Sequence, residues 1–157
     1  ARIVVGPRAG SRDPHGRAFA EGQPGPLAGL LGCRVLNVDG LPPGMSVRAG
    51  GHAVSIWAES YRLAGGEAAV RYDDGPLAGD AAVVRSGAVT TVGAWSETLV
   101  RSLLQDELAA LGIATRDLPD GVRVTRRAGR TVLTNFTEAP VTLDDGAILG
   151  PVSYRIV

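Results

Sequence analysis

Histidine, aspartate and cysteine are the residue types in this chain that most directly suggest metal chemistry. His15 and His52 lie far apart in the sequence, and neither has a second His or Cys at a metal-ligand spacing. Asp13 and His15 could contact a metal ion together, although a solvated loop is the alternative interpretation of that segment. The spacing therefore predicts no metal site.

Paired carboxylates could perform glycosyl transfer, which needs two carboxyl groups on either side of a sugar. Asp73-Asp74 and Asp144-Asp145 are such pairs, and each stands directly before a glycine. Asp-Gly is also the ordinary residue pair of a tight turn. We therefore expect turns at both places and assign no catalytic carboxylate.

Cys33 and Asn135 each have a chemical and a structural interpretation. Cys33 opens a predicted strand after a helix stop, whereas a nucleophilic cysteine more often occupies a strand-to-helix elbow, so we expect a small buried hydrophobe. As the single cysteine, it cannot form an internal disulfide. Asn135-Phe136-Thr137 matches a glycosylation sequon, and a chance match with Asn135 at a strand end is the alternative.

Trp57 and Trp95 could stack on sugar rings, with packing in a core or an interface as the alternative. The glycine pairs at 50–51 and 65–66 lack the strand–helix context of a phosphate-binding loop. No nucleophile–base pair, metal cluster or phosphate loop emerges from the candidates. The sequence therefore predicts no catalytic, cofactor-binding or metal-binding residue, and no cofactor.

Composition limits the class of protein. The chain has 157 residues, 45% of them apolar, and a formal net charge of zero, so we expect a real core and no nucleic-acid or membrane partner. All 16 basic residues are arginine, which is typical of a GC-rich bacterial genome. No apolar run approaches the roughly 18 residues that span a bilayer, and no signal peptide is visible. We expect a bacterial, cytoplasmic protein.

The elements that must position these residues are organised around the segment Val89–Gly112. Val89 to Ala94 is predicted as a buried strand, Ser96 as an N-cap, and Glu97 as a first-turn carboxylate that the helix dipole favours. The apolar residues of the next segment recur at three- and four-residue spacing on one helical face: Val100, Leu103, Leu104, Leu108 and Leu111. Gly112 ends the helix. Strand, turn and helix form half of an α/β unit.

The remaining segments place strands on both sides of this unit. Ile3–Val5 is predicted as a strand of a parallel sheet that opens the chain without a cap, so we expect a fragment lacking its N-terminal part. Arg8–Gly25 is predicted as a long loop, which in a compact domain is usually functional or interfacial. Further strands are predicted before and after the helix: 33–38, 54–63, 68–72, 81–85, 122–127, 131–136, 140–143 and 152–157.

Taken in order, these segments resemble the C-terminal part of glycoside hydrolase family 42 β-galactosidases. The resemblance begins in the apolar strand and basic loop from Val4 to Asp13, although Ala9 stands where the family usually has Ser and Pro14 where an acidic residue is common. It continues through these segments: Pro24–Leu27, Leu30–Gly32, Val35, Trp57 with Glu59, Tyr72–Gly79, Ala82-Val83, Val92-Gly93, Val132–Phe136, Pro140-Val141 and Leu149–Val157.

The resemblance implies a division of labour. It implies that residues 1–115 form a partial flavodoxin-like, or class I glutamine-amidotransferase-like, three-layer α/β domain that mediates trimerisation. A small antiparallel β-sandwich domain would follow at residues 118–157. In this family a (β/α)₈ barrel carries the two catalytic Glu residues of a retaining mechanism and binds the galactoside, and that barrel is absent from this sequence. The implied role is non-catalytic assembly of a homotrimeric β-galactosidase.

Two other classes of function stay open. The chain could be a free-standing flavodoxin-like module that binds a ligand at its strand ends. It could also be a carbohydrate-binding module with Trp57 or Trp95 as the stacking platform. For the assembly role, we expect self-association through the α/β part, with the loop Arg8–Gly25 near the contact.

Overall fold

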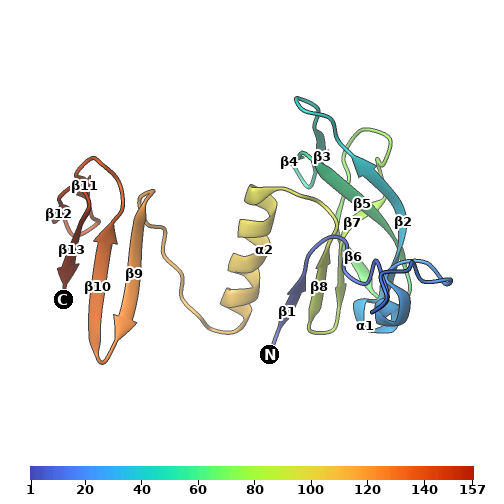
Figure 1. The fold of residues 1–157 in the computed structure, drawn as a ribbon, viewed down its shortest axis with the longest axis horizontal. Helices are drawn as coiled ribbons and strands as arrows, with labels where there is room; N and C mark the ends of the chain where they lie inside the picture. The colour runs from blue at the N-terminus through green and yellow to red at the C-terminus, as the bar shows by residue number, and fades with distance from the viewer. The chain divides into compact units, whose positions relative to one another are not determined.

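The structure, a computed structural model, describes residues 1–157 and divides into two compact units, 1–113 and 114–157. Figure 1 shows the elements of both units in chain order. The assignment of residues 1–115 and 118–157 to two domains with separate roles stays a prediction.

The first unit is built on a six-stranded sheet in the order β1-β8-β7-β5-β2, with β6 paired to β7 (Figure 1). Val83 and Val84 of β7 belong to different hydrophobic clusters, so this strand is buried on both faces. The strands of the sheet are β1 (Ile3–Val5), β2 (Cys33–Gly40), β5 (Trp57–Leu63), β6 (Glu67–Arg71), β7 (Ala81–Ser86) and β8 (Val89–Val92).

The predicted fold class, a flavodoxin-like three-layer α/β domain, is wrong. Strands dominate the first unit, and only β1 and β8 pair in parallel, while every other pair in the sheet is antiparallel. A parallel sheet needs crossover connections of a dozen residues or more, usually helices. The long helix instead follows β8, the last strand of the sheet, so it connects no two strands of it. The fold is predominantly β.

The helices are a short pair of turns and one long helix. The 3₁₀ turn η1 (Gly25–Leu27) leads into α1 (Ala28–Leu31), which ends at the left-handed Gly32. The long helix α2 (Glu97–Ala110) begins as predicted, because the Ser96 hydroxyl accepts a hydrogen bond from the Leu99 amide at 3.4 Å. Neither α-helix is long and apolar enough to cross a membrane.

The buried face of α2 differs from the predicted apolar face. Its buried residues are Leu99, Leu103 and Glu107, at i, i+4 and i+8 spacing, whereas Leu104 is 43% exposed. Trp95, just before the helix, is 54% exposed and shares an open apolar groove along α2 with Leu104. Glu107 is buried where the apolar periodicity predicts a leucine. It can be buried because polar side chains, among them Thr90 of β8, hydrogen-bond to its carboxylate.

The predicted strand 54–63 is interrupted. The ribbon formed by β3 (Val47–Ala49) and β4 (His52–Val54) ends at Val54, and β5 begins only at Trp57. Between them Ile56 adopts a left-handed φ of 70° and is 65% exposed, so it does not share a face with Val54 and Ala58. The alternation that suggested one strand therefore spans a sharp turn.

The second unit is antiparallel. A three-stranded sheet has the order β13-β10-β9, and a two-stranded ribbon joins β11 to β12 around a core of Val122, Leu133 and Leu149. The predicted turn at Asp145-Gly146 is confirmed, and the residues after Ala110 contain no helix. A sandwich of packed sheets stays a prediction. The strands are β9 (Val122–Arg127), β10 (Arg130–Asn135), β11 (Val141–Thr142), β12 (Ile148–Leu149) and β13 (Ser153–Ile156).

Candidate functional site

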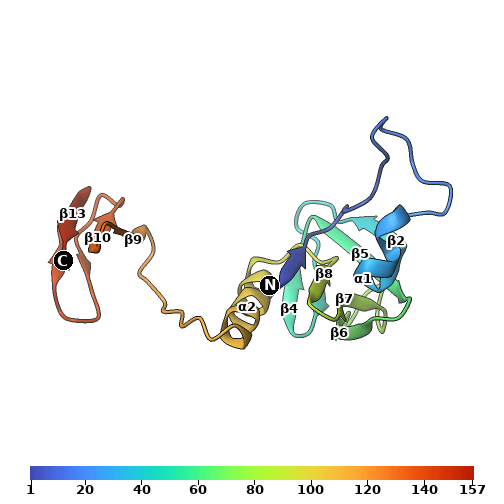
Figure 2. The ribbon, with the colours of Figure 1, turned by 90° about the horizontal axis from the view of Figure 1, so that it is seen from below.

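The segment Arg8–Gly25, called the finger below, is the candidate functional site of the first unit. It contains no strand or helix before Gly25, which confirms the predicted loop. Figure 2 shows it in dark blue, projecting from the sheet before it returns to α1. Two carboxylates, one at each end, hold it in shape.

Glu59 holds the base of the finger. Glu59 is 1% exposed, and the Arg8 amide donates to its Oε1 atom at 3.0 Å. The Trp57 indole donates to the same oxygen at 3.1 Å, and the Tyr61 hydroxyl donates to Oε2 at 3.2 Å. Both carboxylate oxygens are therefore hydrogen-bonded, as a buried carboxylate requires.

The strand geometry of β5 assembles this group. Residues i, i+2 and i+4 of a strand project from one face, so Trp57, Glu59 and Tyr61 point the same way. The backbone carbonyl of Glu59 also accepts a hydrogen bond from the Tyr72 hydroxyl at 2.9 Å. The Arg8 guanidinium lies 5.2 Å from the centre of the Trp57 ring, a cation–π contact. Arg8 itself adopts a left-handed φ of 67°, which turns the chain into the finger.

Burial shifts the titration of the neighbouring acids. Desolvation raises the pKa of the Cys33 thiol to about 11, and it also raises the pKa of the Tyr61 hydroxyl, assisted by the negative charge of Glu59. Cys33 is 0% exposed, which confirms the predicted buried hydrophobe. A thiol of this kind is a poor nucleophile, because the thiolate is the reactive form.

The space between finger and sheet is too small for a substrate. The hollow lined by Ala9, Pro24, Cys33, Glu59 and Thr91 measures about 10 Å³, the scale of a single water molecule. A sugar therefore cannot enter this hollow to contact the Glu59 carboxylate. Its chemistry is that of an anchor, not of a general acid or base.

Asp13 holds the tip of the finger. Its Oδ1 atom accepts hydrogen bonds from the backbone amides of His15 and Arg17, each at 2.9 Å, and its Oδ2 atom pairs with the Arg17 guanidinium at 3.0 Å. The Arg17 amide, above all, lowers the pKa of Asp13. The Arg12 guanidinium closes the turn by donating to the Gly16 carbonyl at 2.9 Å. The predicted loop thus has a defined conformation.

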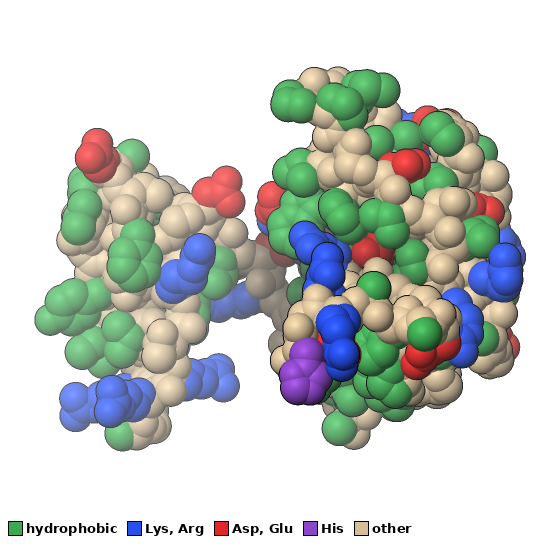
Figure 3. Space-filling model, turned by 45° about the vertical axis from the view of Figure 1, so that its right-hand side comes forward, with side chains coloured by type: hydrophobic (Ala, Val, Ile, Leu, Met, Phe, Trp, Pro, Cys, Tyr) green, Lys and Arg blue, Asp and Glu red, His purple; other side chains and the backbone are tan.

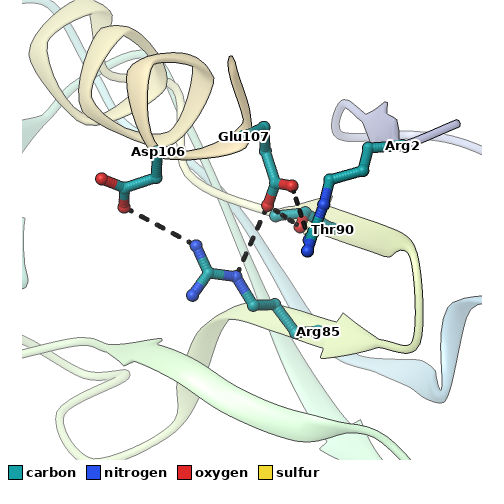
Figure 4. Close-up of polar contacts among 5 residues, drawn as sticks. All are labelled: Arg2, Arg85, Thr90, Asp106 and Glu107. Atoms are coloured by element: carbon teal, nitrogen blue, oxygen red, sulfur yellow. Dashed lines mark hydrogen bonds and ion pairs between the residues drawn. The ribbon is translucent and has the colours of Figure 1, made fainter. Parts of the chain in front are cut away.

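A second buried carboxylate, Glu107, holds α2 against the sheet (Figure 4). It is 5% exposed and accepts hydrogen bonds from the Thr90 hydroxyl at 2.8 Å and from the Arg2 guanidinium at 2.9 Å. Arg85 lies 3.6 Å from Glu107 and 3.6 Å from Asp106. The Thr90 hydroxyl, followed by Arg2, lowers the pKa of Glu107.

The predicted turn carboxylates are engaged by backbone amides. Asp73 accepts hydrogen bonds from the amides of Gly50 and Gly51, at 3.2 and 2.7 Å, and Asp74 accepts one from the Arg48 amide at 2.7 Å. Through these hydrogen bonds Asp73 and Asp74 stabilise the turn between β3 and β4. In the second unit, Asp145 accepts from the Ala147 amide at 3.0 Å. These contacts fit the turn interpretation.

The sequon residue Asn135 is a structural clamp. It is 0% exposed, and its side-chain amide donates to the carbonyls of Ala139 and Gly150 at 2.8 and 2.9 Å. Its oxygen accepts from both the amide and the hydroxyl of Thr137. The amide nitrogen that glycosylation would modify is therefore buried and occupied.

The remaining candidates lie apart. His15 is exposed at the finger tip, and His52 contacts the Thr98 hydroxyl at 2.9 Å near the start of α2. No group of three or more His, Cys, Asp or Glu side chains could hold a metal ion. Sequence reasoning missed the roles of Glu59 and Glu107. For Glu59 the alternation Trp-x-Glu-x-Tyr was an available signal, because both aromatic side chains can donate hydrogen bonds to a carboxylate.

Comparisons with known proteins point to one family. Residues 1–114 match the family described as the β-galactosidase trimerisation domain. A β-galactosidase of Haloferax lucentense is 35% identical over 151 residues, which cover 90% of this chain and 23% of the relative. One from Halorubrum lacusprofundi is 34% identical, with 91% and 24% covered. The chain thus spans about a quarter of the length of these relatives.

Solved structures agree. The β-galactosidase of Halorubrum lacusprofundi superposes with a TM-score of 0.87 at 33% identity, covering 99% of this chain and 27% of that one. The β-galactosidase of Marinomonas ef1 superposes with a TM-score of 0.86 at 25% identity, covering 99% and 25%. The resemblance noted in the sequence is therefore confirmed at the level of the family. The chain belongs to the β-galactosidase trimerisation domain family of glycoside hydrolase family 42.

Proposed function

We propose that this chain is the assembly region of a β-galactosidase, and that its first unit joins copies of the protein into a homotrimer. The observation that carries the proposal is the match of residues 1–114 to a family described as a trimerisation domain. Hydrolysis of terminal β-galactosides, the activity named for the relatives, would then use carboxylates outside these 157 residues.

The chemistry of the first unit supports an assembly role over a catalytic one. Its two buried carboxylates, Glu59 and Glu107, are occupied in holding the finger and α2. The hollow at Glu59 is the size of one water molecule. The features of the first unit that a partner could contact are exposed ones, among them the projecting finger (Figure 2) and Ile3 on the edge strand β1.

Sedimentation equilibrium of the 157-residue chain tests the proposal. We expect self-association at about 100 μM, with a trimer as the largest species, because a stable interface of about 1,200 Å² or more gives affinities in or below this range. Size-exclusion chromatography with light scattering over a concentration series is the check on stoichiometry. A clean monomer at that concentration would reject the assembly role for this chain.

A further inference from the structure

The finger is ordered without help from a partner. Glu59 fixes its base through the Arg8 amide, and Gln23 ties its two ends together by donating to the Ala9 carbonyl at 3.3 Å. The Gln23 carbonyl in turn accepts from the Val35 amide of β2 at 2.9 Å. A loop already held in one conformation loses little entropy when it binds, which is the advantage of a preorganised contact element.

The tip makes its hydrogen bonds to itself. For residues 11–20, the bonds stay inside the finger: Asp13 accepts from His15 and Arg17, Arg12 donates to Gly16, and the Asp13 amide donates to the Arg17 carbonyl. Figure 2 shows this part of the chain standing away from the sheet. An ordered projection whose tip makes no side-chain or backbone hydrogen bond to the rest of its domain has its outer surface free for another molecule.

The outer surface of the tip is cationic. The side chain of Asp13 is 19% exposed and forms an ion pair with Arg17, whose own side chain is 73% exposed. Arg12 and His15 are also exposed, so the tip presents donors outward and keeps its acceptor carboxylate inward. Figure 3 shows arginine side chains and a histidine gathered on one face of the first unit. Such a surface fits a partner rich in carboxylate and carbonyl oxygens.

We propose that the finger docks by its tip onto a second copy of this chain, with the Arg12 guanidinium as a principal contact to carboxylate or carbonyl oxygens of that copy. The inference rests on the proposed function, which makes the partner a second copy. The formal net charge of the chain is zero, so the basic finger is balanced by carboxylates elsewhere on every copy. A contact between two different surfaces of identical chains is heterologous, and it forms a trimer when the rotation between neighbours closes a three-membered ring.

Charge reversal at the tip tests this contact. Arg12→Glu changes an exposed side chain whose one hydrogen bond closes a surface turn, while Arg127→Glu in the second unit is the matched control. Sedimentation equilibrium should show a self-association Kd at least about tenfold weaker for Arg12→Glu and unchanged for Arg127→Glu. The wild-type Kd should also weaken as salt is raised, because exposed charges are screened. Tryptophan fluorescence checks that the first unit is folded.

A labelling experiment gives a second readout that does not depend on charge reversal. Ala18→Cys places a thiol on the finger and Ala78→Cys places one on an exposed turn elsewhere in the first unit. Dilution through the Kd should speed thiol labelling at position 18 and leave position 78 unchanged. The finger contact alone would be overturned if wild type self-associates, Arg12→Glu assembles with the same Kd, and the thiol of Ala18→Cys is labelled equally fast in the assembled and the dissociated states. A monomeric wild type would overturn the assembly role and the finger contact together.

Discussion

Glu59 and Glu107 are both buried carboxylates of the first unit, yet they are neutralised in different ways. Glu59 receives an amide, an indole and a hydroxyl, all of them uncharged donors. Glu107 receives one hydroxyl and the guanidinium of Arg2, with Arg85 near it. The first arrangement relies on hydrogen-bond geometry and the second on opposite charge. The two anchors should therefore respond differently to truncation, to pH and to local chemistry.

The difference follows from what each anchor holds. Glu59 fixes a backbone amide of the finger, and an amide can be held only by an acceptor at hydrogen-bond distance. Glu107 fixes a helix to a sheet through long arginine side chains, which tolerate small displacements. Removal of Glu59 leaves three donors without a partner, whereas removal of Glu107 leaves one buried donor, the Thr90 hydroxyl, and frees two arginine side chains that can reach water. Arg85 is 42% exposed and Arg2 is 35% exposed.

The largest effect is expected for Glu59→Ala. The substitution leaves three donors in a buried site without an acceptor and removes side-chain volume, so we expect a loss of about 3–5 kcal/mol in the free energy of unfolding. Urea unfolding followed by tryptophan fluorescence measures it, because both tryptophans lie in the first unit. Glu67→Ala, on an exposed side chain of β6, is the control and should change stability by less than about 0.5 kcal/mol. Equal effects of the two variants would show that Glu59 is not an anchor.

A smaller effect is expected for Glu107→Gln. The amide keeps an acceptor for the Thr90 hydroxyl but loses the charge that attracts Arg2 and Arg85, so we expect a loss of about 1–3 kcal/mol in unfolding free energy. Asp106→Asn is the matched control on the same helix. Asp106 and Arg85 are both substantially exposed and 3.6 Å apart, so this pair should contribute at most about 0.5 kcal/mol. A loss as large as that of Glu59→Ala would erase the contrast between the anchors.

The pH dependence separates the charge of Glu107 from its shape. Its pKa in the folded state lies below the usual value of 4.5, so the folded protein holds this proton less tightly than the unfolded chain does. Its contribution to stability is complete above pH 4.5 and declines as the pH falls through the lowered value. The difference in unfolding free energy between wild type and Glu107→Gln should therefore shrink on acidification. Asp13 shifts in the same direction, so the comparison with the variant is required.

The sequence predicted local elements better than their assembly. Local residue patterns predict the Ser96 cap, the finger and the antiparallel strands after residue 118, and the structure contains all three. The predicted fold class is wrong, because the strand–turn–helix segment Val89–Gly112 is not half of an α/β unit. The helix in question follows the last strand of the sheet, and pairing direction depends on connections that no local pattern encodes.

The anchors were harder to foresee than the elements. Glu107 occupies a helix position next to Leu108, and apolar periodicity assigns the buried face to the leucine. Its burial depends on Thr90, Arg2 and Arg85, which come from three other places in the sequence. Glu59 depends on the Arg8 amide, a backbone group invisible to side-chain patterns. Residues that satisfy distant partners break the local rules used to predict burial.

The smallest effect, and the most local, is expected at Cys33. This thiol is 0% exposed in the hollow that Glu59 and the finger residues Ala9 and Pro24 also line, so an alkylating reagent reaches it only after a local opening, which we expect to be the finger. Burial also raises its pKa to about 11, which disfavours the reactive thiolate in the closed form. Glu59→Gln keeps one acceptor oxygen but places an amide nitrogen opposite buried donors, which weakens the hold on the Arg8 amide. We expect iodoacetamide to alkylate Cys33 several-fold faster in Glu59→Gln than in wild type. Glu107→Gln should leave the alkylation rate of Cys33 unchanged, because Glu107 holds α2 and not the finger. Faster alkylation in both variants would mean that Cys33 is exposed by global unfolding and that the two anchors act as one cooperative unit.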